Sequence, residues 1–396
     1  MNRYNLLMKR VAFTHDIFPG GGAERVTIDI AKFLYEQYPD YKCYVFTPKI
    51  VEELYTDEVK RYITVVEVSL DKSKRSEDIE RLVKAEGINL IVQVVQPIRH
   101  IQSICKRCGC KTILANHGEP FWERHSVIRR RQKSLLYKPM WRLYWKRHFI
   151  DKNGARNLVI KRVKRQYACC DAYTVLCEDY RQEVCQALGI NPDTSKVVAI
   201  ENSERIVDNV NYDKEKIILF CGRLENTSKR LDRLLRIWGK VQDRLTEYRL
   251  LIVGDGNYRA AMEDQIIREG LKRVDMVGRH SNVEQFYRKA SIVCLTSQTE
   301  GWPLCLTEGQ AHGCITIAFG CSAGVRDILS PSGTNGFVVT PFDEDEYAET
   351  FIHIASMSDE ERDKIRRSSV AKRKLYAPNI IMKKWVKLFE SLLNDN

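Results

Sequence analysis

The chain has 396 residues, 44% of them hydrophobic and 29% charged, and a formal net charge of +12. This length exceeds one ordinary hydrophobic core, so we expect two domains of roughly 150 to 200 residues. No apolar run reaches the roughly 18 residues of a membrane-spanning helix, and the run at residues 5–8 is too short for a signal peptide, so we exclude a spanning protein and expect a cytoplasmic one.

The first half of the sequence alternates short apolar runs with helical patterns. The apolar runs predict strands at residues 10–14, 42–47, 63–68, 90–95, 111–116, 172–177 and 197–200. The stretches between them predict helices at residues 22–38, 76–86, 98–108 and 178–188. Strands too apolar to have a solvated face, alternating with helices, indicate a parallel sheet covered on both sides.

The alternation restarts after a polar stretch at residues 202–216, which we interpret as a linker. Strands are expected at 217–221, 248–253, 274–277, 292–296, 314–318 and 336–339, with helices at 231–245, 258–269, 282–290 and 306–312. We therefore predict an α/β protein with two doubly wound, Rossmann-like domains. The domains are expected at residues 1–205 and 206–376, with a last helix, residues 377–396, returning to the first. Ligands of such sheets bind at the carboxyl ends of the strands, so the loops after strands hold the candidate motifs.

Three consecutive glycines, Gly20, Gly21 and Gly22, follow the first predicted strand and open a helix. Glycine lets backbone N–H groups approach a ligand closely, and the amino end of a helix carries partial positive charge, so a phosphate fits there. A tight strand-to-helix turn explains the same residues equally well.

Two cations, Arg223 and Lys229, lie on the loop after the strand predicted at 217–221. Two positive charges there would clamp a diphosphate and stabilise the charge that builds on it as its bond to a sugar breaks. A solvated basic loop is the alternative.

The most specific motif is a pair of acids, Glu300 and Glu308, with seven residues between them. Gly301 and Pro303 interrupt any helix that would contain both acids. We therefore expect Glu300 on the loop after strand 292–296 and Glu308 in the first turn of the next helix. Carboxylates at this edge of a sheet suit the hydroxyl groups of a sugar or a ribose.

These motifs together resemble glycosyltransferase family 4, retaining enzymes of the GT-B fold with the active site in the cleft between two domains. The resemblance covers nearly the whole chain and is strongest from residue 217 to 342. It implies that Arg223 and Lys229 hold the donor diphosphate, that Glu308 contacts the ribose hydroxyls and that Glu300 contacts the donor sugar. Further donor contacts are implied for Gly21, Gly22, Gly254, Arg279 and Leu304.

His117 follows the strand predicted at 111–116, where the family keeps a histidine that faces the reacting sugar. A lone histidine is more often structural, but its place after a strand favours the catalytic role. Asn202 corresponds to the family's asparagine at the domain crossover, although Ser203 replaces the usual glycine after it. Arg230 likewise replaces a common glycine after the loop lysine.

The resemblance implies a function: transfer of a sugar from a nucleotide-sugar donor to a glycan or lipid-linked acceptor, with retention of configuration, in cell-surface polysaccharide or lipopolysaccharide synthesis. It implies no cofactor and no metal ion, because protein cations neutralise the leaving diphosphate. A nucleotide-sugar epimerase or hydrolase of the same fold is the alternative, and a nucleic-acid-binding protein is a remote one.

The positive charge is concentrated between residues 121 and 165, where 15 Lys or Arg face two acids; the segment carries +13 and the rest of the chain −1. Its aromatic residues alternate with these cations, and one face of an expected helix carries Tyr137, Trp141, Tyr144, Trp145 and His148. Such a face suits an anionic membrane, so we expect peripheral attachment to the inner face of the plasma membrane. Core aromatics with a solvated rim are the alternative. No nucleic-acid-binding motif is present, and no nucleic-acid partner is expected.

The 13 cysteines are scattered and odd in number. Cys105, Cys108 and Cys110 lie close together, but no second CxxC or CxxH pair follows to complete a zinc site. We expect reduced, mostly structural thiols.

Overall fold

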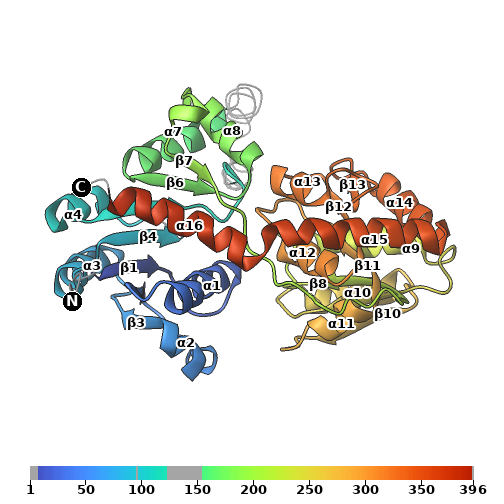
Figure 1. Cartoon of the computed structure of the whole chain (residues 1–396). Coiled ribbons are helices and arrows are strands. Elements are labelled where there is room, and N and C mark those ends of the chain that lie inside the picture. The colour runs from blue at the N-terminus through green and yellow to red at the C-terminus, as the bar shows by residue number, and fades with distance from the viewer. Residues whose placement is uncertain (1–7, 95–96, 123–153, 395–396) are drawn as a thin grey trace. The chain divides into compact units, whose positions relative to one another are not determined.

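The computed structural model describes residues 8–94, 97–122 and 154–394 (Figure 1). These residues form two compact units, Met1–Glu201 together with Ile381–Asn396, and Asn202–Ile380. Each unit contains one parallel sheet, with helices connecting its strands. The predicted α/β architecture of two doubly wound, Rossmann-like sheets is therefore confirmed.

The sheet of the first unit has seven strands in the order β3-β2-β1-β4-β5-β6-β7. Its strands are β1 (Lys9–Thr14), β2 (Tyr41–Thr47), β3 (Ile63–Glu67), β4 (Leu90–Val94), β5 (Lys111–Ala115), β6 (Ala172–Val175) and β7 (Val197–Ala199). The chain builds outward from β1 to β3 and then returns to place β4 on the other side of β1. The topological switch point, where ligands of such sheets bind, therefore lies between β1 and β4.

Helices cover both faces of this sheet. They are α1 (Gly22–Gln37), α2 (Asp57–Tyr62), α3 (Lys72–Glu86), α4 (Ile101–Cys108), α7 (Gly154–Ala168), α8 (Glu178–Leu188) and α16 (Pro378–Leu393). On one face, Ile79 of α3 and Ile104 of α4 are buried, and Ile79 packs with Tyr44 and Phe46 of β2. Side chains alternate along a strand, so Tyr41 of β2 faces the other way, where its ring lies 6.5 Å from that of Phe389 in α16.

The sheet of the second unit has six strands in the order β10-β9-β8-β11-β12-β13. They are β8 (Glu215–Cys221), β9 (Arg249–Val253), β10 (Val274–Gly278), β11 (Ala290–Leu295), β12 (Ile315–Phe319) and β13 (Phe337–Val339). Here the chain moves outward from β8 to β10 and returns to place β11 on the other side of β8. The switch point lies between β8 and β11.

The helices of the second unit are α9 (Leu231–Val241), α10 (Arg259–Arg268), α11 (Glu284–Lys289), α12 (Leu304–Ala311), α13 (Ala323–Leu329), α14 (Glu344–Ser356) and α15 (Asp359–Arg373). Helix α9 is strongly amphipathic and buries Leu234, Leu235 and Trp238. Helix α15 is largely polar and starts with a capping box, in which Ser358 and Glu361 each satisfy a backbone N–H group of the other. Helices α13 to α15 were not among the sequence-based expectations.

Candidate functional site

The central contact of the second unit joins two loops at the switch point of its sheet. Lys229 lies on the loop after β8, and Glu300 lies on the loop after β11. The Lys229 Nζ donates to Glu300 Oε1 over 2.7 Å, and the side chains are 22% and 12% exposed. Two residues singled out by separate motifs, 71 positions apart, are thus in direct contact.

Backbone and side-chain hydrogen bonds hold these two loops together in addition to the ion pair. The Gln298 amide donates to the Ser228 carbonyl over 2.6 Å. The Thr296 hydroxyl donates to the Lys229 carbonyl over 3.3 Å. The Arg233 guanidinium, from α9, donates to Gln298 Oε1 over 2.7 Å. These hydrogen bonds restrain the backbone around Lys229. Less conformational entropy is therefore lost when Lys229 binds a ligand.

The electrostatics of the pair favour a charged lysine. Burial alone lowers the pKa of Lys229, but the adjacent Glu300 carboxylate outweighs that effect and raises the pKa above its ordinary value. Ser297, three residues before Glu300, donates its hydroxyl to the same Oε1 over 2.6 Å. The pair thus presents a permanent positive charge beside a fixed carboxylate.

Arg223 lies on the same loop as Lys229 but has a different environment. Its side chain is exposed, and no hydrogen bond or ion pair joins it to another residue in the described part of the chain. An exposed guanidinium on the loop that also contains Lys229 is available to a phosphate, for which its planar donor array is well suited.

Gly254, on the loop after β9, meets the loop after β8 at its backbone. Its φ of +142° lies in a region that side-chain-bearing residues rarely adopt. A Cβ at this position would collide with the carbonyl oxygen of Gly222. The amide of Gly254 donates to the carbonyl of Gly278, the last residue of β10, over 2.8 Å, which joins the loop after β9 to the end of β10. Arg279 directly follows Gly278 and is exposed.

Glu308 is the fifth residue of α12, which begins at Leu304, so it lies just beyond the first turn in which it was expected. The expectation of a first-turn position is wrong because Pro303 ends the preceding loop and the helix starts immediately after it, two residues before the predicted start. Glu308 Oε2 accepts a hydrogen bond of 2.9 Å from the hydroxyl of Tyr287, a residue only 1% exposed.

Three further residues that the sequence did not predict, Ser297, Tyr287 and Glu204, position this site. Ser297 could have been predicted from the sequence, because it lies three residues before the acid Glu300. Tyr287 lies 21 residues before Glu308, and no sequence pattern relates the two residues. Glu204, 4% exposed, accepts a hydrogen bond of 2.5 Å from Thr307, the residue before Glu308. Glu204 follows Asn202 and Ser203, which are also buried.

In the first unit, the glycine loop forms the start of α1. Gly21 is its N-cap residue and Gly22 its first residue. Glu24, in the first turn, lies 3.4 Å from the buried His15. His117 follows β5 by two residues and is half-buried.

The expected aromatic face at Tyr137, Trp141, Tyr144, Trp145 and His148 lies outside the described residues. Within the described part, no group of three or more His, Cys, Asp or Glu side chains is placed to hold a metal ion. No described helix has both the length and the apolar character needed to cross a membrane.

Comparisons with known proteins match part of the chain to a family model. Residues 202–370 match the family model described as Glycosyl transferases group 1. Amylovoran biosynthesis glycosyltransferase AmsD of Erwinia amylovora is 29% identical over 186 residues, which are 47% of this chain and 51% of that protein. The match therefore spans about half the length of this curated relative.

A second relative matches end to end. It is the GalNAc-alpha-(1->4)-GalNAc-alpha-(1->3)-diNAcBac-PP-undecaprenol alpha-1,4-N-acetyl-D-galactosaminyltransferase of Campylobacter jejuni, 23% identical over 402 residues, covering 98% of this chain and 100% of that one. Among solved structures, Anabaena Alr3699/HepE in complex with UDP and glucose superposes with a TM-score of 0.74 at 15% identity, covering 97% and 100% of the two chains. Residues 202–370 thus match the glycosyltransferase group 1 model, and the predicted GT-B fold is confirmed.

Proposed function

We propose that the protein is a retaining glycosyltransferase of family 4, which transfers a sugar from a nucleotide-sugar donor to a glycan or lipid-linked acceptor. The observation that carries this proposal is the Lys229–Glu300 ion pair at the switch point of a glycosyltransferase group 1 domain. Both curated relatives described above are named as transferases, which favours a transferase over an epimerase or a hydrolase.

In the proposed donor complex, Arg223 and Lys229 bind the diphosphate. Glu300 accepts hydrogen bonds from hydroxyls of the donor sugar, and Glu308 from those of the ribose. Further contacts to the nucleotide come from the loops that contain Gly254, Arg279 and Leu304, and from the Gly21–Gly22 turn of the first unit.

The proposed reaction breaks the bond between the anomeric carbon and the diphosphate oxygen and forms one between that carbon and the acceptor oxygen on the same face. The acceptor hydroxyl gives its proton to an oxygen of the leaving diphosphate. Lys229 and Arg223 stabilise the charge on this leaving group, so we propose that neither a metal ion nor another cofactor is needed. His117 is proposed to face the reacting sugar.

We further propose an acceptor in cell-surface polysaccharide or lipopolysaccharide synthesis, and a cytoplasmic protein bound peripherally to the membrane. The names of the two relatives, which specify amylovoran biosynthesis and a PP-undecaprenol acceptor, support this proposal. The basic composition of residues 121–165 also supports it. Flotation with anionic liposomes but not with neutral ones is the expected result; failure to float with either would refute the attachment.

The test of function compares donor alone with donor plus acceptor. A panel of nucleotide sugars is incubated with the protein, with and without a lipid-linked glycan extract, and each arm is run both with and without excess chelator. A transferase should release nucleotide slowly from donor alone and at least tenfold faster with acceptor. Equal release in both arms would indicate a hydrolase, and a changed donor sugar without release would indicate an epimerase. Loss of activity with chelator would contradict the metal-independent mechanism, and NMR of the product decides whether configuration is retained.

A further inference from the structure

The first unit contains a cavity of about 620 Å³ that lies over the carboxyl ends of its central strands. Thr14 ends β1, Val94 ends β4, and Phe46 and Leu114 lie next to the ends of β2 and β5. The cavity therefore occupies the switch point between β1 and β4, where doubly wound sheets bind ligands. Its volume is in the range of small-molecule sites.

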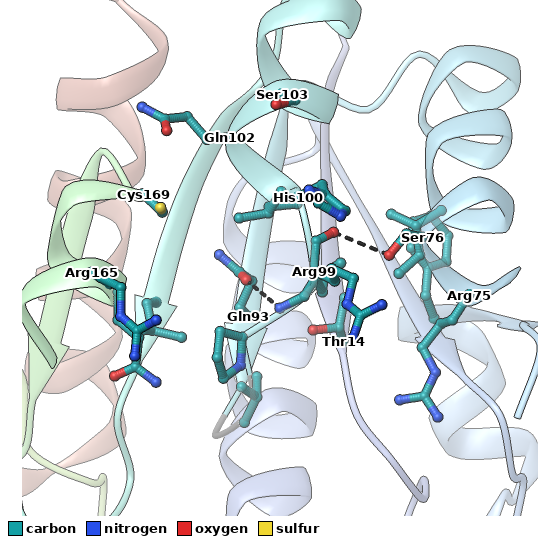
Figure 2. Close-up of a pocket in the computed structure, with 18 of the residues that line it drawn as sticks. Thr14, Arg75, Ser76, Gln93, Arg99, His100, Gln102, Ser103, Arg165 and Cys169 are labelled. Carbon is teal, nitrogen blue, oxygen red and sulfur yellow. Dashed lines mark hydrogen bonds between the residues drawn. The ribbon is translucent and has the colours of Figure 1, made fainter. Parts of the chain in front are cut away.

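The rim of this cavity is strongly basic. Four arginines line it, against one acid, Asp16. Figure 2 shows Arg165 of α7 on one side and Arg75 of α3 on the other, with Arg99 between them. Asp16 pairs with Arg75 over 2.7 Å. Arg99 and Arg165 are exposed, and within residues 8–94, 97–122 and 154–394 neither has an acidic partner.

The loop that presents Arg99 is fixed in place. The Arg99 carbonyl accepts a hydrogen bond of 3.1 Å from the Ser76 hydroxyl of α3 (Figure 2). The Ile98 amide donates to Gln93 Oε1 over 2.8 Å, and Gln93 in turn donates to Thr112 over 2.8 Å. Gln93 is 1% exposed, so a buried polar network anchors the rim to the sheet.

The floor of the cavity has the mixed character of a sugar site. Phe46, Ile79 and Leu114 give it apolar surface. Thr14 is 8% exposed, and its hydroxyl makes no hydrogen bond to any other described residue. An apolar floor with a free hydroxyl suits a sugar ring, and unpaired arginines above it suit an anionic group attached to that ring.

We infer that this cavity binds the acceptor of the proposed transfer reaction through an anionic group of that acceptor, which Arg99 and Arg165 hold. The acceptor is thus an acidic or phosphorylated glycan. This inference rests on the proposed function for the identity of the ligand as acceptor. The anionic group is a diphosphate linked to the sugar or the carboxylate of an acidic sugar, and the experiment distinguishes the two.

The test is a binding titration with three probes: inorganic pyrophosphate, glucuronate and glucose. We compare the wild-type protein with the double variant Arg99→Ala/Arg165→Ala. The matched control is Arg107→Ala on the outer side of α4, where Arg107 pairs with Glu80. Each lost charge-assisted contact should weaken binding roughly tenfold. A second variant, Lys229→Ala, separates pyrophosphate bound in the second unit from pyrophosphate bound in the cavity.

The inference predicts that the double variant loses affinity for pyrophosphate or for glucuronate, that glucose binding is unaffected and that Arg107→Ala behaves as wild type. If the double variant loses affinity for pyrophosphate, the acceptor is diphosphate-linked. If it loses affinity for glucuronate, the acceptor contains an acidic sugar. Unchanged affinity for both anions overturns the inference. In turnover assays the double variant should raise KM for the acceptor and leave KM for the donor unchanged. If pyrophosphate or glucuronate binding depends on Arg99 and Arg165 but no nucleotide sugar is turned over, the proposed function fails while the anion site stands.

Discussion

The two sheets share one winding pattern, yet their switch points hold opposite kinds of surface. In the second unit, an ion pair between Lys229 and Glu300 crosses the switch point, and hydrogen bonds tie the flanking loops together. In the first unit, the switch point is an open cavity in which Arg99 and Arg165 have no acidic partner among the described residues. The fold therefore sets where a ligand can bind, and the side chains on the loops decide which chemistry that ligand has.

The close approach of Gly254 to Gly222 is the most sensitive point of the second site. Gly254→Ala should cost roughly 3 kcal/mol or more in the free energy of unfolding, because a Cβ meets a backbone oxygen and the φ of +142° is strained for alanine. Gly270→Ala is the control, since Gly270 has a φ of +61° with open space around it and should cost only about 1 kcal/mol. The free energy of unfolding of both variants is measured by urea denaturation. Equal losses in Gly254→Ala and Gly270→Ala would show that the Gly254–Gly222 contact does not hold the loops after β8 and β9 together.

Removal of the lysine charge tests whether the ion pair serves catalysis. Lys229→Ala should lower turnover by roughly tenfold to 100-fold, because the leaving diphosphate loses a cation. Lys240→Ala removes a lysine of the same unit that pairs with Asp345 at the surface, and it should leave turnover unchanged. A Lys229→Ala protein that keeps its fold by circular dichroism and also its wild-type rate would rule out the diphosphate role.

The hydrogen bond from Tyr287 to Glu308 should matter less. Tyr287→Phe removes one donor to the carboxylate, so KM for the donor should rise about threefold to tenfold with a small change in kcat. Tyr347→Phe is the matched control: its buried hydroxyl donates to the Ile317 carbonyl over 2.9 Å and does not touch Glu308. A similar KM in both variants would mean that Glu308 does not need this orientation to bind the donor.

The sequence predicted both sheets and most of their strands, because continuous apolar runs between helical patterns mark buried parallel strands. It also predicted that Glu300 and Glu308 do not share a helix, since Gly301 and Pro303 prevent it. Contacts between distant segments could not be predicted. The Tyr287–Glu308 bond depends on the packing of α11 near α12, and the Gly254–Gly222 contact depends on how two loops meet.

The cavity of the first unit was likewise not predicted. Its lining comes from the ends of β1, β2, β4 and β5 together with α3, the loop before α4, α4 itself and α7, and no sequence motif relates these segments to one another. Arg165 belongs to the basic segment at residues 121–165, and no motif in the sequence singles out Arg99. Arg99 and Arg165 line the same cavity because both lie near the β1–β4 switch point. The position of that switch point is known only once the strand order is known.

The central claim is that Arg223 and Lys229 bind the diphosphate of the donor. The most direct test of this claim measures the binding of nucleoside diphosphates. UDP, GDP and ADP are titrated calorimetrically into the wild-type protein, Arg223→Ala and the control Arg244→Ala, which removes a surface arginine paired with Glu349. We predict that at least one diphosphate binds, that Arg223→Ala weakens it roughly tenfold and that Arg244→Ala does not. Wild-type affinity in Arg223→Ala, or no binding of any of the three, would contradict the claim.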